Sequence, residues 1–424
     1  MMVHDIIVIG AGMVGTSIAW HLRDRGANVL LVDRNDPGQE TSYGNAGLIQ
    51  REAVFPHPFP RAFSETLSVL PNQRPDIRYQ LSGVLRYAPK LMAYRYFSAP
   101  KRWQALAEQW AQLISTCLDE HQRMIQAAQA DDLIRRRGWL QLHRSAEALR
   151  VELTQAQRAA DQYGVEFDTL SPEQLKAIEP HVNTRVFSGA IHWKNSWQVT
   201  DPGGLVKRYA DDFVAQGGTF KRKRVTRIHQ NAVGRWRVIC GSEHLTAQHV
   251  VIAAGPWSMQ LLKPLNYNFP LFPKRGYHWH YRPIVEQSLQ HSILDADNGY
   301  LLGPMDMGIR LTTGAEMASL YGPPRRAQIQ LCERIARDIL PLGKAIEPQP
   351  WYGSRPCFPD MKPIIGPAPK HRHLWLAIGH AHQGFTLGPT TGRLLSELIY
   401  EQSPFVDPQP FSAERFKSLG PFTC

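Results

Sequence analysis

The first 33 residues hold the pattern that most limits what this chain can fold into. Residues 6–9 form an apolar, β-branched run, and residues 10–15 follow at once with the spacing Gly-x-Gly-x-x-Gly. Apolar residues then recur at helical spacing over 14–25. A second apolar run, 29–32, closes on Asp33. This order predicts a strand, a tight turn, a helix and a second strand.

Each fixed residue of this pattern has a physical role in binding a dinucleotide. Gly10 permits the turn, Gly12 lets the backbone approach a pyrophosphate, and Gly15 lets the helix pack closely on the strand. The start of the helix offers free N–H groups and a positive dipole end to phosphates. Asp33 stands where an acidic side chain accepts hydrogen bonds from a ribose. We therefore predict a bound dinucleotide.

A loop of small residues, ETSYGNAGLIQ at 40–50, follows the second strand. Small side chains and hydroxyls suit a loop that lies against a planar ring and a phosphate. An ordinary turn is the alternative, but the position directly after the dinucleotide pattern favours a loop that contacts the cofactor.

The size and composition of the chain fit a globular protein with two domains. It has 424 residues, of which 43% are hydrophobic and 20% charged. No apolar run reaches the roughly 18 residues of a membrane-spanning helix. We expect no cleavable signal, because the chain leads straight into its first strand. Five cysteines without Cys-x-x-Cys spacing favour a reducing cytoplasm and no disulfides.

The net charge of +11 has three interpretations: a membrane surface, an anionic substrate, or simply a basic protein. Basic clusters at 135–137 and 221–224 lie outside any recognisable nucleic-acid-binding module, so no nucleic acid is expected.

The segment 77–100 is rich in basic and aromatic residues. Tyr87, Lys90, Leu91, Tyr94 and Arg95 suggest a surface for a partner, or for peripheral contact with the inner face of a membrane. The favoured interpretation is a pair of core helices whose basic side chains reach solvent.

Further patterns predict the remaining elements. Helices are expected over 101–128, about 145–163, about 202–216, about 324–340 and up to Tyr400. Strands are expected over 139–143, 186–193, 219–225, 236–239, 250–253 and 374–378, with antiparallel sheet over 267–313.

Several ordered motifs together point to a known family. The opening pattern resembles that of glutathione-reductase-type flavoproteins. The motifs ETSYGNAG, VIAAGPWS, PKRGY (273–277), NGYLLGP (298–304), GSRPCFPDMKPIIG (353–366) and IGHAHQGFTLGPTTGRLLSELI (378–399) resemble the D-amino-acid oxidase and glycine oxidase family of FAD-dependent oxidoreductases. Within it, the chain looks most like the bacterial D-amino-acid dehydrogenase branch.

The resemblance implies a mixed α/β and α+β fold with two discontinuous domains. A glutathione-reductase-type Rossmann domain that binds FAD would comprise 1–55, 196–262 and 351–424. A substrate-binding domain, with a mostly antiparallel sheet and flanking helices, would comprise 56–195 and 263–350.

The resemblance also implies roles for single residues. Arg355 would clamp the substrate carboxylate, Tyr300 would face the substrate, and His380 would lie beside the flavin. The residues implied to bind the cofactor are Gly10, Gly12, Met13, Val14, Gly15, Asp33, Arg34, Thr41, Ser42, Asn45, Ala46, Gly47, Leu48, Val225, Ala254, Gly255, Gly379, Gln383, Gly384, Phe385 and Thr386.

One segment departs from the family pattern. The family often has Asp-Gly after the Arg-Pro pair, whereas here Asp360 precedes Met361 and Lys362. We expect a different turn there, with Lys362 as a candidate second contact for an anion.

Two other chemistries are not expected. His-x-His pairs occur at 278/280, 371/373 and 380/382, but no third ligand stands at metal-site spacing, so no metal is predicted. Cys357 does not match the offset at which related amine oxidases attach flavin, so the FAD is expected to be non-covalent.

The predicted function is oxidative deamination of a small amino acid, with D-amino acids first. A hydride would pass from Cα to the flavin N5, and the imine would hydrolyse to a 2-oxo acid and ammonia. The cofactor supplies the electronics, and a planar guanidinium such as that of Arg355 orients the carboxylate.

Three alternatives stay open at this point. The first is an oxidase or dehydrogenase that acts on a secondary amino acid: a glycine derivative, sarcosine, an iminodiacetate-like compound or hydroxyproline. The second is an electron-transferring flavoprotein subunit of a complex, and the third a non-enzymatic NAD-binding module. Oxygen, a quinone and a partner protein remain candidate electron acceptors.

Overall fold

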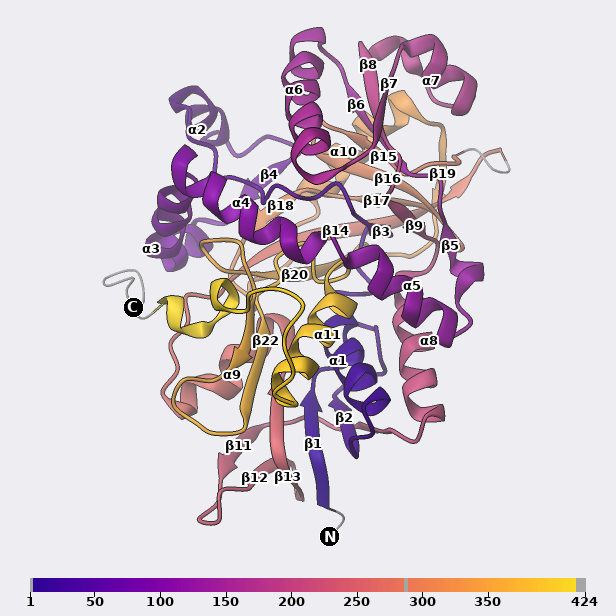
Figure 1. Ribbon diagram of the computed structural model, residues 1–424. Helices are drawn as coiled ribbons and strands as arrows, with labels where there is room; N and C mark the ends of the chain where they lie inside the picture. The colour runs from indigo at the N-terminus through magenta and orange to yellow at the C-terminus, as the bar shows by residue number, and fades with distance from the viewer. Residues whose placement is uncertain (1–2, 286–288, 417–424) are drawn as a thin grey trace.

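The structure is a computed structural model that describes residues 3–285 and 289–416. Its strands form an eight-stranded sheet, an eleven-stranded sheet and a three-stranded sheet. In the view of Figure 1 the eight-stranded sheet lies in the lower half of the molecule and the eleven-stranded sheet in the upper half.

The strand that leads into the glycine-rich turn lies at the centre of the eight-stranded sheet. β1 (Val3–Ile9) pairs in parallel with β2 (Val29–Asp33) on one side and β13 (Glu243–Ile252) on the other. β10 (Thr219–Arg222) continues the parallel order beyond β2, and β22 (Leu374–Ile378) does so beyond β13. Segments from both ends of the chain therefore form one parallel core.

The other strands of this sheet are antiparallel additions, β11 (Arg227–Gln230), β12 (Trp236–Cys240) and β21 (Ile364–Pro367). β13 is longer than the predicted strand 250–253. Its first half, EHLTAQ, is polar and pairs with β12 in an outer hairpin, so it lacks the apolar run on which the prediction rested.

Helices α1 (Met13–Asp24), α8 (Pro202–Ala215) and α11 (Gly388–Ile399) pack beside this sheet (Figure 1). α8 begins as predicted, with Pro202 in its first turn and the Asp201 carboxylate accepting from the Gly204 N–H at 2.9 Å. α9 (Ser258–Leu262) is a shorter helix after β13.

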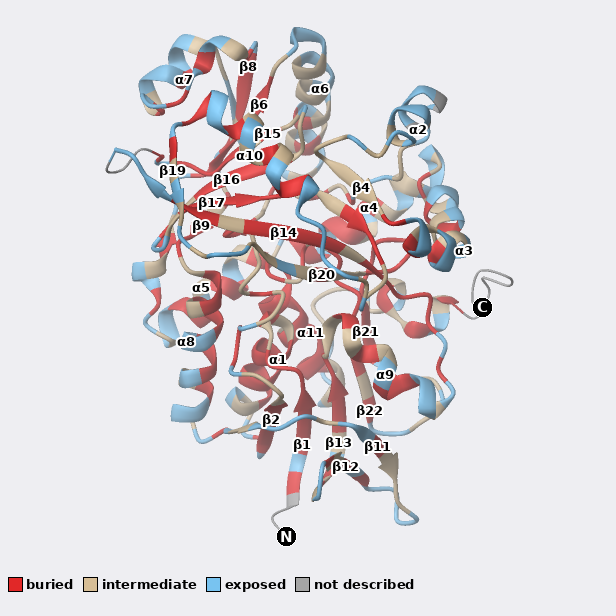
Figure 2. Ribbon diagram, turned by 180° about the vertical axis from the view of Figure 1, so that it is seen from behind, coloured by how far each residue is buried: buried red, intermediate tan, exposed pale blue. Residues whose placement is uncertain are grey.

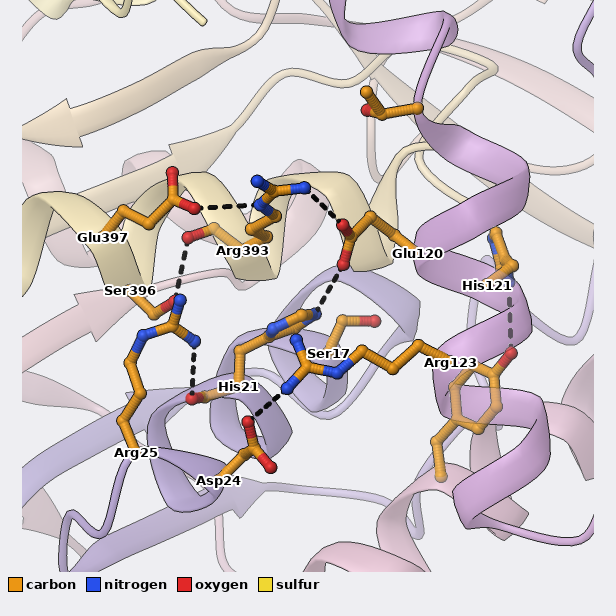
Figure 3. Close-up of polar contacts among 12 residues, drawn as sticks. Ser17, His21, Asp24, Arg25, Glu120, His121, Arg123, Arg393, Ser396 and Glu397 are labelled. Atoms are coloured by element: carbon orange, nitrogen blue, oxygen red, sulfur yellow. Dashed lines mark hydrogen bonds and ion pairs between the residues drawn. The ribbon is translucent and has the colours of Figure 1, made fainter. Parts of the chain in front are cut away.

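A buried polar cluster joins α1, α11 and α5 (Cys117–Ala127), as Figure 3 shows. Arg393 pairs with Glu120 and with Glu397, each at 2.8 Å. His21, fully buried, lies with Nε2 3.8 Å from Glu120. Burial and then the nearby Arg123 hold the pKa of His21 well below its usual value, so it is neutral at pH 7.

The eleven-stranded sheet is mostly antiparallel, as predicted. Only the pairs β15–β6 and β18–β4 are parallel among its described strands. Its strands are β4 (Ile77–Tyr79), β6 (Trp139–His143), β7 (Phe167–Leu170), β8 (Gly189–Trp193), β14 (Phe272–Pro283), β15 (Ile293–Asp295), β16 (Tyr300–Met305), β17 (Gly308–Thr312), β18 (Ala315–Met317), β19 (Leu342–Ala345) and β20 (Trp351–Cys357).

Helices α6 (Ala146–Tyr163), α7 (Pro172–Ile178) and α10 (Ala327–Ile339) flank that sheet. The small sheet consists of β3 (Leu48–Ile49), β9 (Trp197–Val199) and β5 (Ile134–Arg135). The mixed α/β and α+β fold is thus as expected. However, β20, placed by the prediction in the cofactor domain, pairs with β14 in the eleven-stranded sheet.

The predicted helix 101–128 is two helices, α4 (Pro100–Ile114) and α5, separated at Ser115 and Thr116. Apolar spacing continues across the break, and no Gly or Pro marks it. Two further helices, α2 (Phe63–Val69) and α3 (Leu81–Phe97), precede α4.

Burial follows this architecture. Figure 2 shows β1, β13 and β14 largely buried, whereas α2 and α3 carry many exposed residues. The four described cysteines are free and buried, and Cys424 lies outside the described residues. Within 3–285 and 289–416, no helix has the length and apolar character needed to cross a bilayer.

Gly392 sets the distance between α11 and α1. A Cβ at this position would lie 2.6 Å from the His21 ring and 2.7 Å from the Ser17 carbonyl oxygen. We expect Gly392→Leu to destabilise the protein by about 1–3 kcal/mol and to lower its melting temperature. Gly392→Ala should also destabilise, although alanine normally favours a helix. Thermal unfolding of both variants measures this, and unchanged melting temperatures would contradict the packing argument.

Candidate active site

A cavity of about 1380 Å³ is lined by residues from both large sheets. At one end lie the glycine-rich turn before α1 and the ends of β2 and β13. At the other end lie β14 and β20, and the loop after β22 borders both ends. The cavity therefore joins the predicted dinucleotide site to the predicted carboxylate clamp.

The glycine-rich turn is a cradle in which side chains have no room. A Cβ on Gly15 would lie 1.8 Å from the Gly10 carbonyl oxygen, and one on Gly10 would lie 2.3 Å from the Ala253 carbonyl oxygen. Gly10 also has a φ of 113°, which favours glycine. The first turn of α1 thus lies against β1 and β13 with its backbone facing the cavity, an arrangement that suits a pyrophosphate.

Asp33 is held at the end of β2 by main-chain donors. Its two carboxylate oxygens accept from the Ala11 N–H at 2.7 Å and the Asn35 N–H at 3.0 Å. Beside it, the Arg34 guanidinium lies 4.0 Å from the centre of the Trp257 ring and pairs with Glu40 at 2.5 Å. These contacts fix the Asp33 carboxylate, a hydrogen-bond acceptor, where a ribose is expected. They also fix the Arg34–Trp257 stack, a flat surface, where a base is expected.

The predicted cofactor residues line this cavity with three exceptions. Gly15 packs against Gly10 as described. Gly47 turns the loop with a φ of 73° and donates to the Asn45 side chain at 2.8 Å. Thr386 accepts from the Gln50 N–H at 3.2 Å. These three residues do not line the cavity themselves but support the segments that do.

The loop after β22 faces the loop 40–50 across the cavity. Gln383 donates to the Gln50 side chain at 3.0 Å. His380 lines the cavity and lies 3.0 Å from the Thr391 hydroxyl, and burial lowers its pKa to about 3. It is therefore neutral and placed beside the region where a flavin ring is expected.

Arg355 lies at the opposite end, on β20. Arg355 is half-buried on the cavity wall, and its guanidinium donates to the carbonyl oxygens of Gly314 at 2.7 Å and Thr313 at 3.3 Å. It lies over Gly276, where a Cβ would be 2.8 Å from Nη2. No acidic side chain pairs with it within the described ranges. A half-buried guanidinium that lines a cavity and has no anionic partner is available to bind an anionic ligand.

Tyr300 does not line the cavity. Its neighbours Gly299 and Leu301 do, and Tyr300 instead packs in the core of the eleven-stranded sheet. The expectation that it faces the substrate is wrong, because alternation along the strand turns it to the other face. The tyrosines that line the cavity are Tyr79, Tyr94 and Tyr277.

Lys362 also lies outside the cavity lining. Its Nζ donates to the Gln109 side chain of α4 at 2.5 Å, and burial lowers its pKa to about 8. The turn before it is held by Arg415, which pairs with Asp360 at 2.7 Å. Lys362 is therefore not the second anion contact that the sequence suggested.

Three residues that were not predicted line the end of the cavity that holds Arg355: Lys274, His57 and His382. Lys274 stands directly opposite Arg355 in the β14–β20 pair. The rings of His57 and His382 lie 5.1 Å apart. PKRGY and the His-x-His pair at 380/382 were visible in the sequence, but only the strand register shows that they converge.

The pair His278 and His280 is joined by Glu347, from a segment that spacing could not identify. His280 contacts Glu347 through Nδ1 and accepts from the Arg310 guanidinium at 2.8 Å through Nε2. Arg310 also donates to the carbonyl oxygens of Tyr43 and Asn45. The Arg310 guanidinium already occupies Nε2 of His280, so this cluster is poorly suited to bind a metal ion. Through the contacts of Arg310 it instead supports the loop 40–50.

Cys357 lines the cavity, but burial raises the pKa of its thiol. A neutral thiol is a poor nucleophile. Non-covalent binding of FAD thus remains our prediction.

Comparisons with known proteins show the family and the fold of the chain. The pattern of the family described as FAD dependent oxidoreductase matches residues 5–398. A D-amino-acid oxidase of Bradyrhizobium diazoefficiens is 27% identical over 426 residues, covering 97% of this chain and 98% of the relative. A D-amino acid dehydrogenase of Chromohalobacter salexigens is 29% identical over 427 residues, covering 97% and 99%.

Among solved structures, glycine oxidase from Geobacillus kaustophilus superimposes with a TM-score of 0.72. It is 21% identical, and the match covers 97% of this chain and 98% of the oxidase.

The unpaired guanidinium of Arg355 gives a direct test of the site. We expect Arg355→Ala to lower kcat/KM by an amount that corresponds to a loss of about 3–5 kcal/mol in transition-state stabilisation. The variant should retain its flavin. Steady-state kinetics together with the flavin absorbance of the purified variant measure both. Lys362→Met is the matched control, a buried cation outside the cavity. Unchanged kcat/KM in Arg355→Ala would remove this residue from the site.

Proposed function

The chain belongs to the family of FAD-dependent oxidoreductases, which its sequence matches over residues 5–398. We propose that it oxidises a small amino acid, with D-amino acids as the first candidate substrates. Both curated relatives above carry names of that activity. Oxidation gives an imine, which water converts to a 2-oxo acid and ammonia. FAD, when bound, accepts the hydride.

One observation carries this proposal: the half-buried guanidinium of Arg355, which has no carboxylate partner among the described residues, shares a cavity with a dinucleotide cradle. Arg355 binds the substrate carboxylate and fixes its orientation, and this holds Cα near the region between the loops 40–50 and 379–385. Proximity and orientation supply much of the rate in such a reaction. Neutral His380 is proposed to lie beside the flavin without adding charge.

We propose the same division of labour for the two discontinuous domains. Residues 1–55, 196–262 and 351–424 are assigned to FAD, with the reservation that β20 brings Arg355 in from the other sheet. Residues 56–195 and 263–350 are assigned to the substrate. A secondary amino acid is the second candidate substrate, since Arg355 would clamp its carboxylate equally well.

Anaerobic bleaching of the flavin tests the substrate class. The purified holoenzyme is mixed with D-amino acids, their L-enantiomers, and N-substituted glycines. We expect D-amino acids to bleach the flavin and L-enantiomers to leave it oxidised. Bleaching by glycine derivatives or imino acids alone would establish the second candidate. No bleaching by any of them would favour an electron-transferring subunit.

We further propose that the electron acceptor is a membrane quinone. Tyr87 and Tyr94 of α3 are buried, as the favoured sequence interpretation held. The outer side of α3, however, is apolar: Leu81, Leu85 and Met92 are 65%, 68% and 65% exposed. An exposed apolar stripe on a helix is typical of a contact surface.

Charge and cavity shape support a lipid surface as the partner. Residues 77–107 contain six basic side chains and no acidic one, which favours anionic headgroups. Leu70 and Leu81 are 61% and 65% exposed and also line the cavity. They mark an opening on the same face as the stripe, through which an apolar acceptor can approach.

Vesicle binding tests this surface. The holoenzyme should sediment with phosphatidylglycerol vesicles and less with phosphatidylcholine vesicles. Replacing Leu85 and Met92 together by Glu should weaken binding by about tenfold or more, while bleaching by the amino acid is unchanged. Equal sedimentation of variant and parent would refute a lipid contact at α3. Reoxidation by oxygen as fast as by a quinone would refute the acceptor.

A further inference from the structure

Two cations without anionic partners lie side by side at the substrate end of the cavity. Lys274 on β14 is the register partner of Arg355 on β20. Directly opposed residues of an antiparallel pair point to the same face, with Cβ atoms about 4.5–5.5 Å apart. Both residues line the cavity. The two charges therefore face one space.

Lys274 makes no ion pair within the described part of the chain. Its Nζ lies 4.1 Å from the centre of the Tyr94 ring, a contact that leaves the ammonium donors available. The next residue, Arg275, points to the opposite face and is satisfied by Glu316 at 3.4 Å and the Gly322 carbonyl oxygen at 2.6 Å. The same strand thus neutralises one cation internally and leaves the other facing the cavity.

The pair His57 and His382 completes this end without adding charge. His57 is exposed to the cavity and His382 is half-buried. Desolvation by the surrounding protein, and then Lys274 and Arg355, lower the pKa of His57; desolvation, and then His57, Arg355 and Lys274, lower the pKa of His382. All four groups line the same cavity: Lys274 is the register partner of Arg355, and the His57 and His382 rings lie 5.1 Å apart. The neutral rings can donate or accept hydrogen bonds, but they cannot balance two positive charges.

One α-carboxylate neutralises only one of the two cations. From this juxtaposition we propose that the substrate is a dicarboxylic amino acid, whose α-carboxylate binds Arg355 and whose second carboxylate binds Lys274. This rests on the proposed function, because it assigns Arg355 to the α-carboxylate. The second carboxylate belongs either to an acidic side chain or to an N-carboxymethyl group, and both place an anion within reach of the same lysine.

Rapid anaerobic reduction of the flavin separates these cases. D-aspartate and D-glutamate are compared with D-alanine, and iminodiacetate with sarcosine. We expect a diacid to reduce the flavin more efficiently than its monoacid counterpart. In Lys274→Met this preference, measured as the ratio of diacid to monoacid efficiency, should fall about a hundredfold. Lys274→Arg should keep much of the preference. Lys362→Met, which changes a buried lysine outside the cavity, should behave as the parent.

Unreactive acids provide a readout that does not depend on turnover. Malonate and succinate should perturb the flavin absorbance and raise the melting temperature at lower concentrations than acetate or propionate. Lys274→Met should abolish that difference. Failure of every amino acid to reduce the flavin, with this dicarboxylate binding intact, would refute the proposed function and leave the two-anion site standing.

Three results would overturn the proposal. The first is that monoacids reduce the flavin of the parent enzyme as efficiently as diacids do. The second is equal slowing of monoacids and diacids in Lys274→Met, which would assign Lys274 to the cofactor or the acceptor. The third is dicarboxylate binding that survives in Lys274→Met.

Discussion

The site depends on how closely the first turn of α1 approaches the sheet beneath it. The carbonyl oxygen of Gly10 occupies the space that a side chain on Gly15 would need. This contact fixes the backbone that faces the cavity, and it brings the Ala11 N–H to Asp33. Since α11 packs on α1 at Gly392, the loop 379–385 is placed relative to the same turn. Both sides of the cofactor end therefore derive from one backbone contact.

The cations around the cavity are held in two ways. Arg275 and Arg310 are buried: Arg275 pairs with Glu316, and Arg310 donates to two main-chain carbonyls and to His280. Arg355 and Lys274 are half-buried and line the cavity, and neither has a carboxylate partner among the described residues. A charge that is removed from water needs compensation. We propose that a ligand supplies this compensation here.

Sequence patterns predicted the features that depend on residues close to one another in the chain. The glycine-rich turn, the strand–helix–strand order around it and Asp33 were all visible, because periodicity and turn chemistry act over a few residues. The motif around Arg355 pointed to a residue that the structure places on the cavity wall. The placements that were not predicted depend on contacts between distant segments: the face of β16 that carries Tyr300, the position of Lys362 outside the cavity and that of Lys274 on its wall. The placements of Tyr300 and Lys274 depend on strand register, which a sequence pattern does not show. Glu347 joins His280 for the same reason.

The parallel core has a consequence for how the protein is made. β1 is synthesised first, yet its neighbour β13 comes some 240 residues later, and β22 with α11 is among the last segments to emerge. A nascent chain lacking residues 374–399 has neither the outer strand nor the helix that packs on α1. Domains often fold in order during translation, but the parallel core described above is complete only when residues 374–399 are present. We therefore expect the cofactor end to form late in synthesis.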